Sequence, residues 1–320
     1  MWKEIDDRQS EGVVTGRRWT DGEHPEVVVG DIAARPPTTG RVITFANEKG
    51  GVGKSTLAFH CAIALAHAGH RVVALDLDSR QATLERGLAF REATAKILGL
   101  ALPMPAHAVL SRPCAAQLHQ ELLRLDARAD YIVLDAPGTD CRIFRRAVAM
   151  ANTLVTPINA SFVDLPVLGH VDPVSGLAGR SGAFADTVVA LRRERERQGL
   201  RPIDWLVAKN RVRHCERRHI GRIDTALATL AGQKDFRIVH GLTERVAFRE
   251  LFQFGLTHLD LALIPGVARA SAETVGEVAT LLGEFVREVP RVRRRAPAAP
   301  PARTSARARA AYREALSAAL

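Results

Sequence analysis

The run Asn-Glu-Lys-Gly-Gly-Val-Gly-Lys-Ser-Thr at residues 47–56 decides the fold, because it joins a buried strand to a helix. The short apolar run at 41–46 predicts the strand, and residues 54–68 predict a helix that ends at Gly69. Glycines let the connecting backbone turn tightly with its N–H groups pointing inward, and the helix N-terminus adds a positive dipole. The sequence therefore predicts a phosphate-binding loop.

The residue types in this loop suit a nucleoside triphosphate. We expect Lys54 to reach the β- and γ-phosphates, Ser55 to place its hydroxyl on Mg²⁺, and Thr56 to contact the α-phosphate. The other residues predicted to bind the nucleotide form the turn itself: Gly50, Gly51, Val52 and Gly53. ATP and Mg²⁺ are the expected cofactors.

The loop departs from the usual spacing at its start. The first glycine would fall at position 48, which is Glu48, and an extra lysine, Lys49, precedes the glycines instead. The pattern Lys-Gly-Gly-x-Gly-Lys-Ser/Thr is the deviant Walker A motif. A second cation stabilises charge on the transferring phosphoryl group, an effect of about 10³–10⁵ for arginine fingers. We expect Lys49 to act in trans on a partner's phosphates, so that ATP holds a homodimer together.

Three carboxylates complete the predicted site. Asp135 ends the apolar strand 131–134 and is expected to hold Mg²⁺ through water. Asp76 and Asp78 follow the strand 72–75 and point the same way on an extended chain. One of the two is expected to support the metal and the other to orient the attacking water. We assign the metal to Asp76 and the water to Asp78, which makes Lys49, Lys54 and Asp78 the candidate catalytic residues.

Short runs rich in Val, Ile and Leu alternate with helical stretches through the middle of the chain. This alternation predicts an α/β fold, with a doubly wound, mostly parallel sheet and helices on both faces. We expect one ATPase domain at residues 40–286, a mostly disordered arm at 1–39 and a basic tail at 287–320 with a possible short helix at 305–320. The tail holds nine arginines and two glutamates, which is +7 of the chain's formal charge of +10.

Composition excludes several classes of protein. No apolar run reaches the roughly 18–20 residues of a membrane span, and the polar N-terminus is no signal peptide. The four cysteines lack metal-site spacing, so we expect reduced thiols in a cytoplasmic protein.

The three motifs together resemble the ParA/MinD group of deviant Walker ATPases, over roughly residues 40–285. They are Lys49 to Thr56, Asp76-Leu-Asp78 and Asp135-Ala-Pro-Gly138. The resemblance implies a P-loop NTPase fold and slow ATP hydrolysis that depends on the dimer. It also implies that Asn210, at the end of a strand, reads adenine.

Within that group the chain resembles the MipZ type, which positions the division plane. The segments that carry the likeness are 47–51, 76–81, 161–164, 171–173 and 245–257. The resemblance implies that Gly50 lies at the dimer face and Asp78 is required for hydrolysis. It implies nonspecific DNA binding by the ATP dimer through Arg218 and Arg222, a ParB-like partition partner, inhibition of FtsZ assembly and a location on the nucleoid.

Other readings stay open beside this one. A ParA-like ATPase that partitions DNA or another cargo carries the same motifs. A MinD-like, membrane-associated ATPase needs an apolar C-terminal helix, for which Tyr312, Leu316 and Leu320 provide only a thin stripe. We therefore expect no stable membrane insertion. Metabolic enzymes of the same fold are a third class, and they predict a small-molecule substrate.

Overall fold

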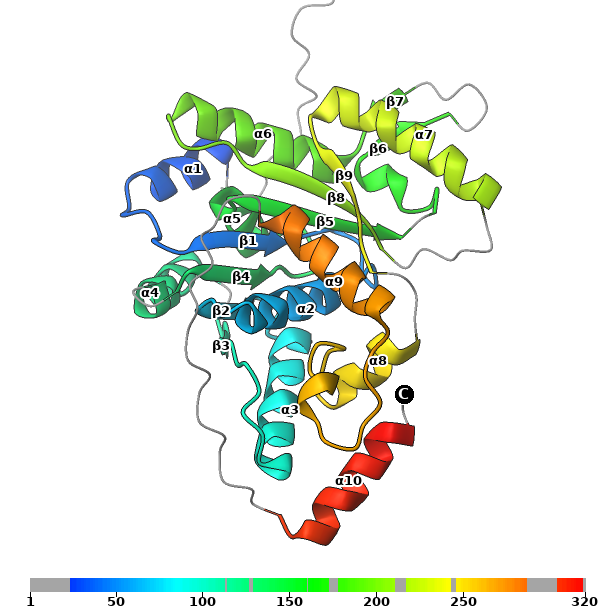
Figure 1. Ribbon diagram of the computed structural model, residues 1–320. Helices are drawn as coiled ribbons and strands as arrows, with labels where there is room; N and C mark the ends of the chain where they lie inside the picture. The colour runs from blue at the N-terminus through cyan, green and yellow to red at the C-terminus, as the bar shows by residue number, and fades with distance from the viewer. Residues whose placement is uncertain are drawn as a thin grey trace, which may run out of the picture.

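A seven-stranded parallel sheet forms the centre of the computed structural model, which describes residues 24–112, 114–126, 129–159, 161–172, 178–210, 217–242, 246–286 and 304–318. In space the strands run in the order β3-β2-β4-β1-β5-β8-β9, and all six neighbouring pairs are parallel (Figure 1). Their bounds are β1 Arg41–Phe45, β2 Val72–Asp76, β3 Ala106–Val109, β4 Tyr131–Asp135, β5 Thr153–Asn159, β8 Asp204–Asn210 and β9 Arg237–His240. The predicted doubly wound fold is confirmed.

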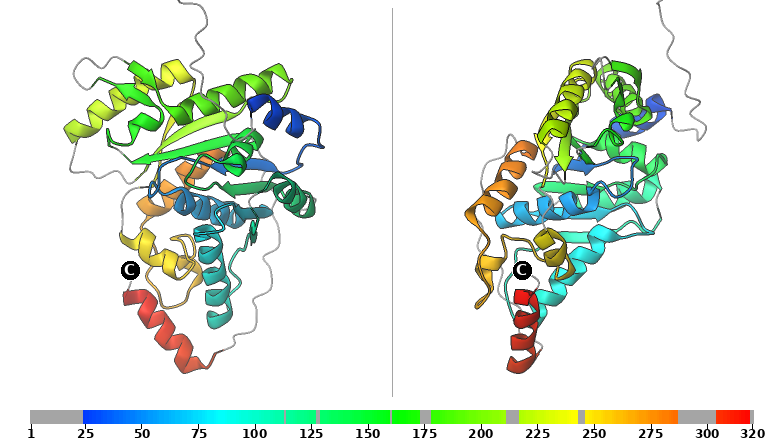
Figure 2. Two further views of the ribbon diagram at one scale, coloured as in Figure 1. Left: turned by 180° about the vertical axis from the view of Figure 1, so that it is seen from behind. Right: turned by 90° about the vertical axis from the view of Figure 1, so that its right-hand side faces the viewer.

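Helices cover both faces of the sheet, and a separate apolar cluster lies under each layer (Figure 2). Successive side chains of β1 alternate between the clusters, with Val42 in one and Ile43 and Phe45 in the other, as strand geometry requires. The Ile43 side carries α2 (Lys54–His67), the start of α3 (Thr83–Leu98) and α9 (Ala272–Phe285). The Val42 side carries α4 (Ala115–Asp126), α5 (Arg142–Met150), α6 (Ala183–Arg197) and α7 (Arg217–Lys234).

Smaller elements lie around this sandwich. An antiparallel pair, β6 (Gly169–Val171) and β7 (Ala178–Ser181), follows the short 3₁₀ turn η1 (Leu165–Val167). Below the sheet in Figure 1, α8 (Val246–Gln253), the turn η2 (Leu261–Leu263) and the end of α3 share a third apolar cluster. Sequence reasoning missed β3, the β6–β7 pair and α8, all of which are short.

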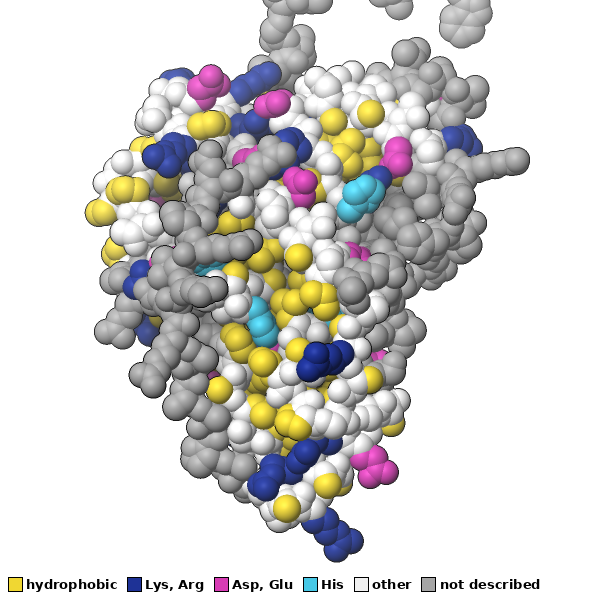
Figure 3. Space-filling view, viewed as in Figure 1, with side chains coloured by type: hydrophobic (Ala, Val, Ile, Leu, Met, Phe, Trp, Pro, Cys, Tyr) yellow, Lys and Arg dark blue, Asp and Glu magenta, His cyan; other side chains and the backbone are white. Residues whose placement is uncertain are grey.

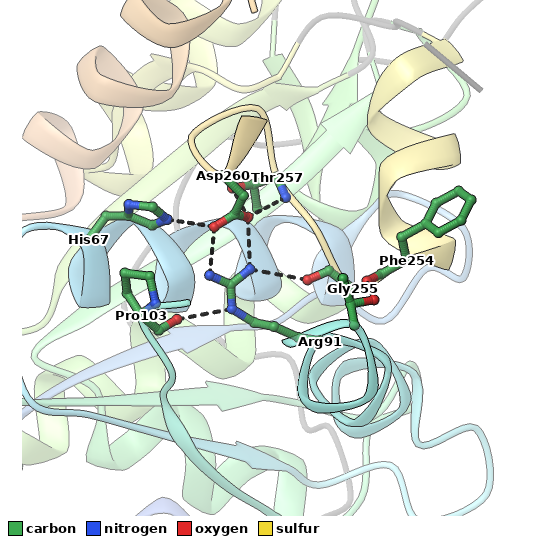
Figure 4. A network of polar contacts seen from close by, with 8 residues as sticks. His67, Arg91, Pro103, Phe254, Gly255, Thr257 and Asp260 are labelled. Atoms are coloured by element: carbon green, nitrogen blue, oxygen red, sulfur yellow. Dashed lines mark hydrogen bonds and ion pairs between the residues drawn. The ribbon is translucent and has the colours of Figure 1, made fainter. Parts of the chain in front are cut away.

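A buried ion pair joins this lower region to α2 and α3 (Figure 4). Arg91 on α3 and Asp260 before η2 are both fully buried, and their closest N–O distance is 2.6 Å. Asp260 also accepts from His67 Nε2 at 2.7 Å and from the Thr257 N–H at 2.7 Å. The Arg91 guanidinium holds the pKa of Asp260 well below its usual range in spite of burial. The network ties α2, α3 and the segment after α8 into one unit.

The arm at 1–39 was expected to be mostly disordered, and this is wrong for its second half. Residues Pro25–Ala33 form helix α1, which packs on α5 and α6. Pro25 suits a first helical position, His24 caps the helix, and Val28 and Val29 are fully buried in the main core. Burial of these valines stabilises a helix too short to be read from periodicity. Residues 1–23 lie outside the described part.

The predicted C-terminal helix is present as α10 (Ala306–Ala318), and it is docked on the domain. Leu316 is fully buried, the Tyr312 hydroxyl lies 2.6 Å from Thr94 Oγ1, and its ring packs edge-on against Phe254. Figure 3 shows Lys and Arg side chains around this lower tip. Residues 287–303 are outside the described part. Within the described residues, no helix has the length and apolarity needed to cross a bilayer.

Candidate functional site

The predicted loop and carboxylates meet at the carboxyl edge of the sheet. Asp135 at the end of β4 is in register with Phe45 of β1 on one side and Asp76 of β2 on the other. The chain runs from β1 through the loop into α2. On one side of β1 the strand order continues through β4, β2 and β3, and on the other side through β5, β8 and β9. Ligands of open α/β sheets bind at such a switch point.

A cavity of about 200 Å³ opens above the loop. Its lining includes most of the predicted nucleotide residues together with Asp78 and four residues that sequence reasoning had not assigned to the site: Gln81, Thr83, Ala136 and Gly138. The motifs that carry Gln81 and Gly138 were visible in the sequence, whereas Thr83 enters only because α3 begins beside the loop.

Two loop positions require glycine for conformation or space. Gly51 and Gly53 have φ of +74° and +93°, and a Cβ on Gly53 would lie 2.3 Å from Asn210 Nδ2. Gly50 differs, because it is exposed and a Cβ there meets nothing within 4 Å. The fold of the single chain therefore does not explain why a glycine stands at position 50.

Lys54 is placed to contact phosphate. It is 8% exposed, and its Nζ donates to the Lys49 carbonyl oxygen at 3.0 Å, close to Gly138. Burial lowers the pKa of Lys54, while the nearby Asp135 and Asp78 act in the opposite direction. An ammonium has three donors, so this geometry leaves donors for phosphate oxygens.

Asp135 and Ser55 fit a magnesium site. Asp135 is 1% exposed, accepts a hydrogen bond from Ser55, and keeps a buried Oδ1 with no hydrogen-bond partner in the described structure. Burial and the neighbouring Asp76 raise the pKa of Asp135 to about 8. A buried carboxylate oxygen beside a hydroxyl is the donor set that a hydrated Mg²⁺ uses in P-loop proteins.

Both carboxylate oxygens of Asp76 accept main-chain hydrogen bonds. Its Oδ1 accepts the Asp78 N–H at 3.0 Å, and its Oδ2 accepts the Leu84 and Glu85 N–H groups at 2.9 and 3.2 Å. Oδ2 thus holds the first turn of α3, which lacks a side-chain N-cap of its own, while Oδ1 holds the turn after β2. Burial raises the pKa of Asp76 to about 6 against these bonds. A direct metal contact by Asp76 stays a prediction.

Asp78 lines the cavity, and the hydrogen bonds in the described structure use only one of its two carboxylate oxygens. Its Oδ1 accepts the N–H groups of Arg80 and Gln81 at 3.2 and 3.1 Å, which fixes the carboxylate at the start of a turn. The described contacts leave Oδ2 available. A carboxylate held in this way at the edge of a phosphate cavity can orient a water molecule.

Lys49 points away from the cavity and onto the loop after β5. Its Nζ donates to the Val163 carbonyl at 3.1 Å and forms an ion pair with Asp164, which is 2% exposed. Asp164 also accepts the Asn159 N–H at 2.9 Å. The prediction missed Asp164 as a site residue, although segment 161–164 was recognised. Its signal was an acidic residue in a segment of the family resemblance to which sequence reasoning assigned no chemical role.

Asn210 braces the loop in this structure. Its Nδ2 donates to the Val52 carbonyl at 2.9 Å, and its Oδ1 accepts the Leu242 N–H at 3.1 Å. The side chain is 3% exposed and does not line the 200 Å³ cavity. The predicted contact with adenine stays a prediction, and the observed role is to position Val52 and Gly53.

The two predicted DNA contacts lie on α7. Arg222 is exposed, and its guanidinium carbon lies 5.5 Å from the centre of the Phe162 ring. Arg218 is in the first turn of the same helix, four residues earlier, and its side chain lies outside the described part. Phe162 directly precedes Val163, so the loop that holds Lys49 also contacts Arg222.

Comparison with known proteins identifies the domain. The family model described as ATPase MipZ matches residues 41–284. The chromosome-partitioning ATPase Soj of Thermus thermophilus is 34% identical over 143 residues, covering 39% of this chain and 57% of Soj. The septum site-determining protein MinD of Thermotoga maritima is 28% identical over 169 residues, covering 46% of this chain and 61% of MinD. The chain thus spans less than two thirds of either relative.

A solved structure supports the fold. The ATP complex of an McdA variant from Cyanothece has a TM-score of 0.52 at 16% identity, and it covers 80% of this chain and 100% of its own. At this identity the likeness concerns the fold alone. The family match itself leaves out α1, which precedes it, and α10, which follows it.

Proposed function

The chain belongs to the MipZ family of ATPases, and from this we propose that it is an ATP-driven switch whose ATP dimer binds nonspecific DNA and regulates where the cell divides. The observation that carries the proposal is the cavity that joins the glycine loop, Lys54 and Asp78, with Asp135 buried behind it. The rest of the cycle is argued from these residues and from Lys49.

Hydrolysis needs a bound triphosphate, an oriented water and stabilised negative charge. In the proposed step the loop N–H groups and Lys54 hold the phosphates, while Ser55 and Asp135 would hold Mg²⁺, which would supply positive charge to offset the charge that develops on the phosphates. Oδ2 of Asp78 accepts a hydrogen bond from the attacking water and aligns it with the γ-phosphorus. The products are ADP and phosphate. Asp78→Ala is expected to bind ATP, retain it and remain in the dimeric state.

Dimerisation is proposed to bring Lys49 to the partner's phosphates. In the single chain Lys49 is paired with Asp164, so reaching a second site requires this ion pair to open. Gly50 is exposed with free space around it, and Val163 beside Lys49 is 74% exposed, a large value for an apolar side chain. Close approach of a second chain over these positions accounts for both features.

The same loop offers a link between ATP and DNA. Lys49 holds Val163 and Asp164, and the next residue back, Phe162, stacks on Arg222. If Lys49 leaves for the partner's phosphates, the loop loses two contacts, which would weaken the hold of Phe162 on Arg222 and favour contact of Arg222 with a DNA phosphate. Each such contact contributes about 0.9 to the slope of log affinity against log salt. The cation–π contact itself is worth about 0.5–1 kcal/mol at an exposed site, a bias of two- to fivefold.

The cellular partners follow from the family rather than from the site. We propose a ParB-like protein and FtsZ as partners, and a cytoplasmic location on the nucleoid. A ParA-like role in partitioning another cargo is the second candidate, and the match to Soj favours it. The MinD-like alternative is weakened by α10, because Tyr312 and Leu316 contact the domain itself and are not available to a bilayer.

DNA binding by Asp78→Ala, measured with ATP and with ADP across a salt series, tests the proposal. Binding that requires ATP and weakens steeply with salt would support a nucleotide-gated DNA switch. Equal binding in both nucleotides would assign the affinity to the basic tail, and no binding would end the DNA proposal. In the same assay, Phe162→Leu should raise DNA affinity in ADP about two- to fivefold and leave the ATP value nearly unchanged. An unchanged ADP value would exclude the Phe162 link.

A further inference from the structure

A second cavity, of about 260 Å³, lies at the opposite edge of the sheet from the phosphate loop. Its lining includes Thr38 just before β1 and Asn152 just before β5, so it sits at the amino ends of the parallel strands. Its walls come from α1 and residues 34–38, and from α4, α5 and α6. Nothing in the ATPase cycle uses this cavity.

The cavity is completed by a part of the chain that precedes the family match. The match begins at residue 41, whereas α1 spans Pro25–Ala33. Val28 and Val29 anchor α1 in the core, and Glu26 pairs with Arg197 of α6 at 3.0 Å. The wall is therefore a fixed addition to the ATPase domain.

The lining combines an apolar body with excess positive charge. Three arginines face one carboxylate, because Arg35 and Arg146 both pair with Asp31 and leave Arg195 without an acidic partner in the described structure. The apolar lining residues that define its shape are Ile32, Pro36, Leu118, Leu122, Met150 and Leu200. Burial lowers the pKa of His119, with Arg35 acting in the same direction and Asp31 in the opposite one.

Arg195 is the residue that points to a ligand. It is 5% exposed, and its hydrogen bonds go to main-chain carbonyls: to Arg201 at 3.0 and 2.6 Å and to Ala149. These use three of the five guanidinium N–H donors and supply no negative charge. Burial lowers the pKa of Arg195 with no opposing contribution from a carboxylate. Buried charges are ordinarily paired, because desolvation of an unpaired ion is costly.

We propose that this cavity binds an organic anion with an apolar body, such as an aromatic or short-chain carboxylate. The carboxylate supplies the charge missing beside Arg195 and accepts its remaining N–H donors, as arginine forks commonly do. The apolar body fills the space between α1 and α4. A cavity near the lower end of the usual range of about 300–1,000 Å³ suits a ligand of one or two rings.

The test is calorimetric titration of the full chain with 2-naphthoate, with the phosphate loop saturated by Mg²⁺-ADP. We expect one site per chain, and much weaker binding of 2-naphthalenemethanol, which has the same rings without the charge. Ile32→Trp, which fills the cavity from α1, should abolish binding. At Leu123, an exposed lining residue, Leu123→Glu should weaken binding about threefold by charge repulsion at the rim. The matched Leu123→Lys should not weaken it.

The proposal would be overturned if all three variants bound 2-naphthoate as tightly as the wild type, or if the wild type bound the alcohol as tightly as the carboxylate. No detectable binding of 2-naphthoate to the wild type would also overturn it. Binding seen only after removal of residues 1–23 would also overturn it, because the natural occupant would then be the chain's own arm. Repeating the titration with Lys54→Ala separates this site from the ATPase proposal. Unchanged naphthoate binding there would show that the second site stands even if the nucleotide site does not act as proposed.

Discussion

Replacing Asp135 by Asn should change how the stability of the nucleotide-free protein depends on pH. The pKa of Asp135 is raised to about 8 by burial and by Asp76, against an ordinary value of 3.8. Between these values the folded protein holds a proton that the unfolded chain has released, so stability falls as pH rises. This sign is opposite to that of an acid in a salt bridge. Asp135→Asn removes the titrating carboxyl group, so the stability of the variant should not fall with rising pH in this way.

The window from pH 6.5 to 8 contains most of the change that the comparison with Asp135→Asn can resolve. In the folded protein Asp76, with a pKa of about 6, and His60, with a pKa of about 3, are mostly deprotonated there. What remains of their contribution, including titration of His60 in the unfolded chain, is shared by wild type and variant. One pKa unit corresponds to about 1.4 kcal/mol, and allowing for partial titration near the pKa, Asp135 should cost the wild type about 1.6 kcal/mol of stability across the window. Asp135→Asn should lose little.

Urea denaturation at several pH values, without metal or nucleotide, measures this difference. Added Mg²⁺-ADP should flatten the wild-type curve, because a cation beside Asp135 favours the ionised form. It should leave the pH dependence of the Asp135→Asn variant unchanged, since the variant lacks the ionisable carboxylate. Parallel wild-type and Asp135→Asn curves from pH 6.5 to 8 would refute the reasoning and show that Asp135 is ionised in the empty site.

Three further variants test the interface, the lower region and the tail. Gly50→Val should bind ATP normally but stay monomeric by light scattering, whereas Gly51→Val should lose ATP binding because its φ of +74° does not suit a side chain; a dimeric Gly50→Val would contradict the interface. Asp260→Asn leaves Arg91 buried and unpaired and should lower the free energy of unfolding by about 3–5 kcal/mol. Asp235→Asn breaks an exposed ion pair with Arg192 and should lower the free energy of unfolding by at most about 1 kcal/mol. Equal losses of stability in the Asp260 and Asp235 variants would contradict the argument from burial. Leu316→Ala should weaken docking of α10 by about 2–5 kcal/mol and speed proteolysis of the tail, while Ser317→Ala on the exposed side should not.

The loop and its sheet were predictable because their signals are local. The glycines, Lys54 and Ser55 lie within a few residues of each other, and the strand before them and helix after them are strongly patterned. Asp135 was equally accessible, since parallel strands bring their carboxyl ends to one edge. The glycines, Lys54 and Ser55 therefore line the cavity, and Asp135 ends β4 at the same edge of the sheet.

Other features depend on which residues the fold brings together. Nothing in the sequence pairs Lys49 with Asp164, which lies 115 positions later, or places Asn210 under the loop. Asp76 is a similar case: its metal contact stays a prediction, and the sequence did not indicate that its two oxygens accept the N–H groups of Asp78 and of the first turn of α3. Helix α1 was missed because its stability comes from Val28 and Val29 packing on helices far along the chain.

The two helices outside the family match contact the domain far from the phosphates, and this limits how they can act. α1 sits at the amino edge of the sheet, and α10 sits against Thr94 near the end of α3, while the cavity lies at the carboxyl edge. Neither can touch the nucleotide, so an effect of either on hydrolysis must pass through an element that also reaches the loop. For α10 that element is α3, whose first turn is held by Asp76 and lies beside Asp78. For α1 it is α5 and the start of β5, where the Asn152 side chain accepts the Val42 N–H of β1 at 2.8 Å. The loop follows directly from β1, so a ligand beside Asn152 would act on the strand that carries Gly50 to Thr56.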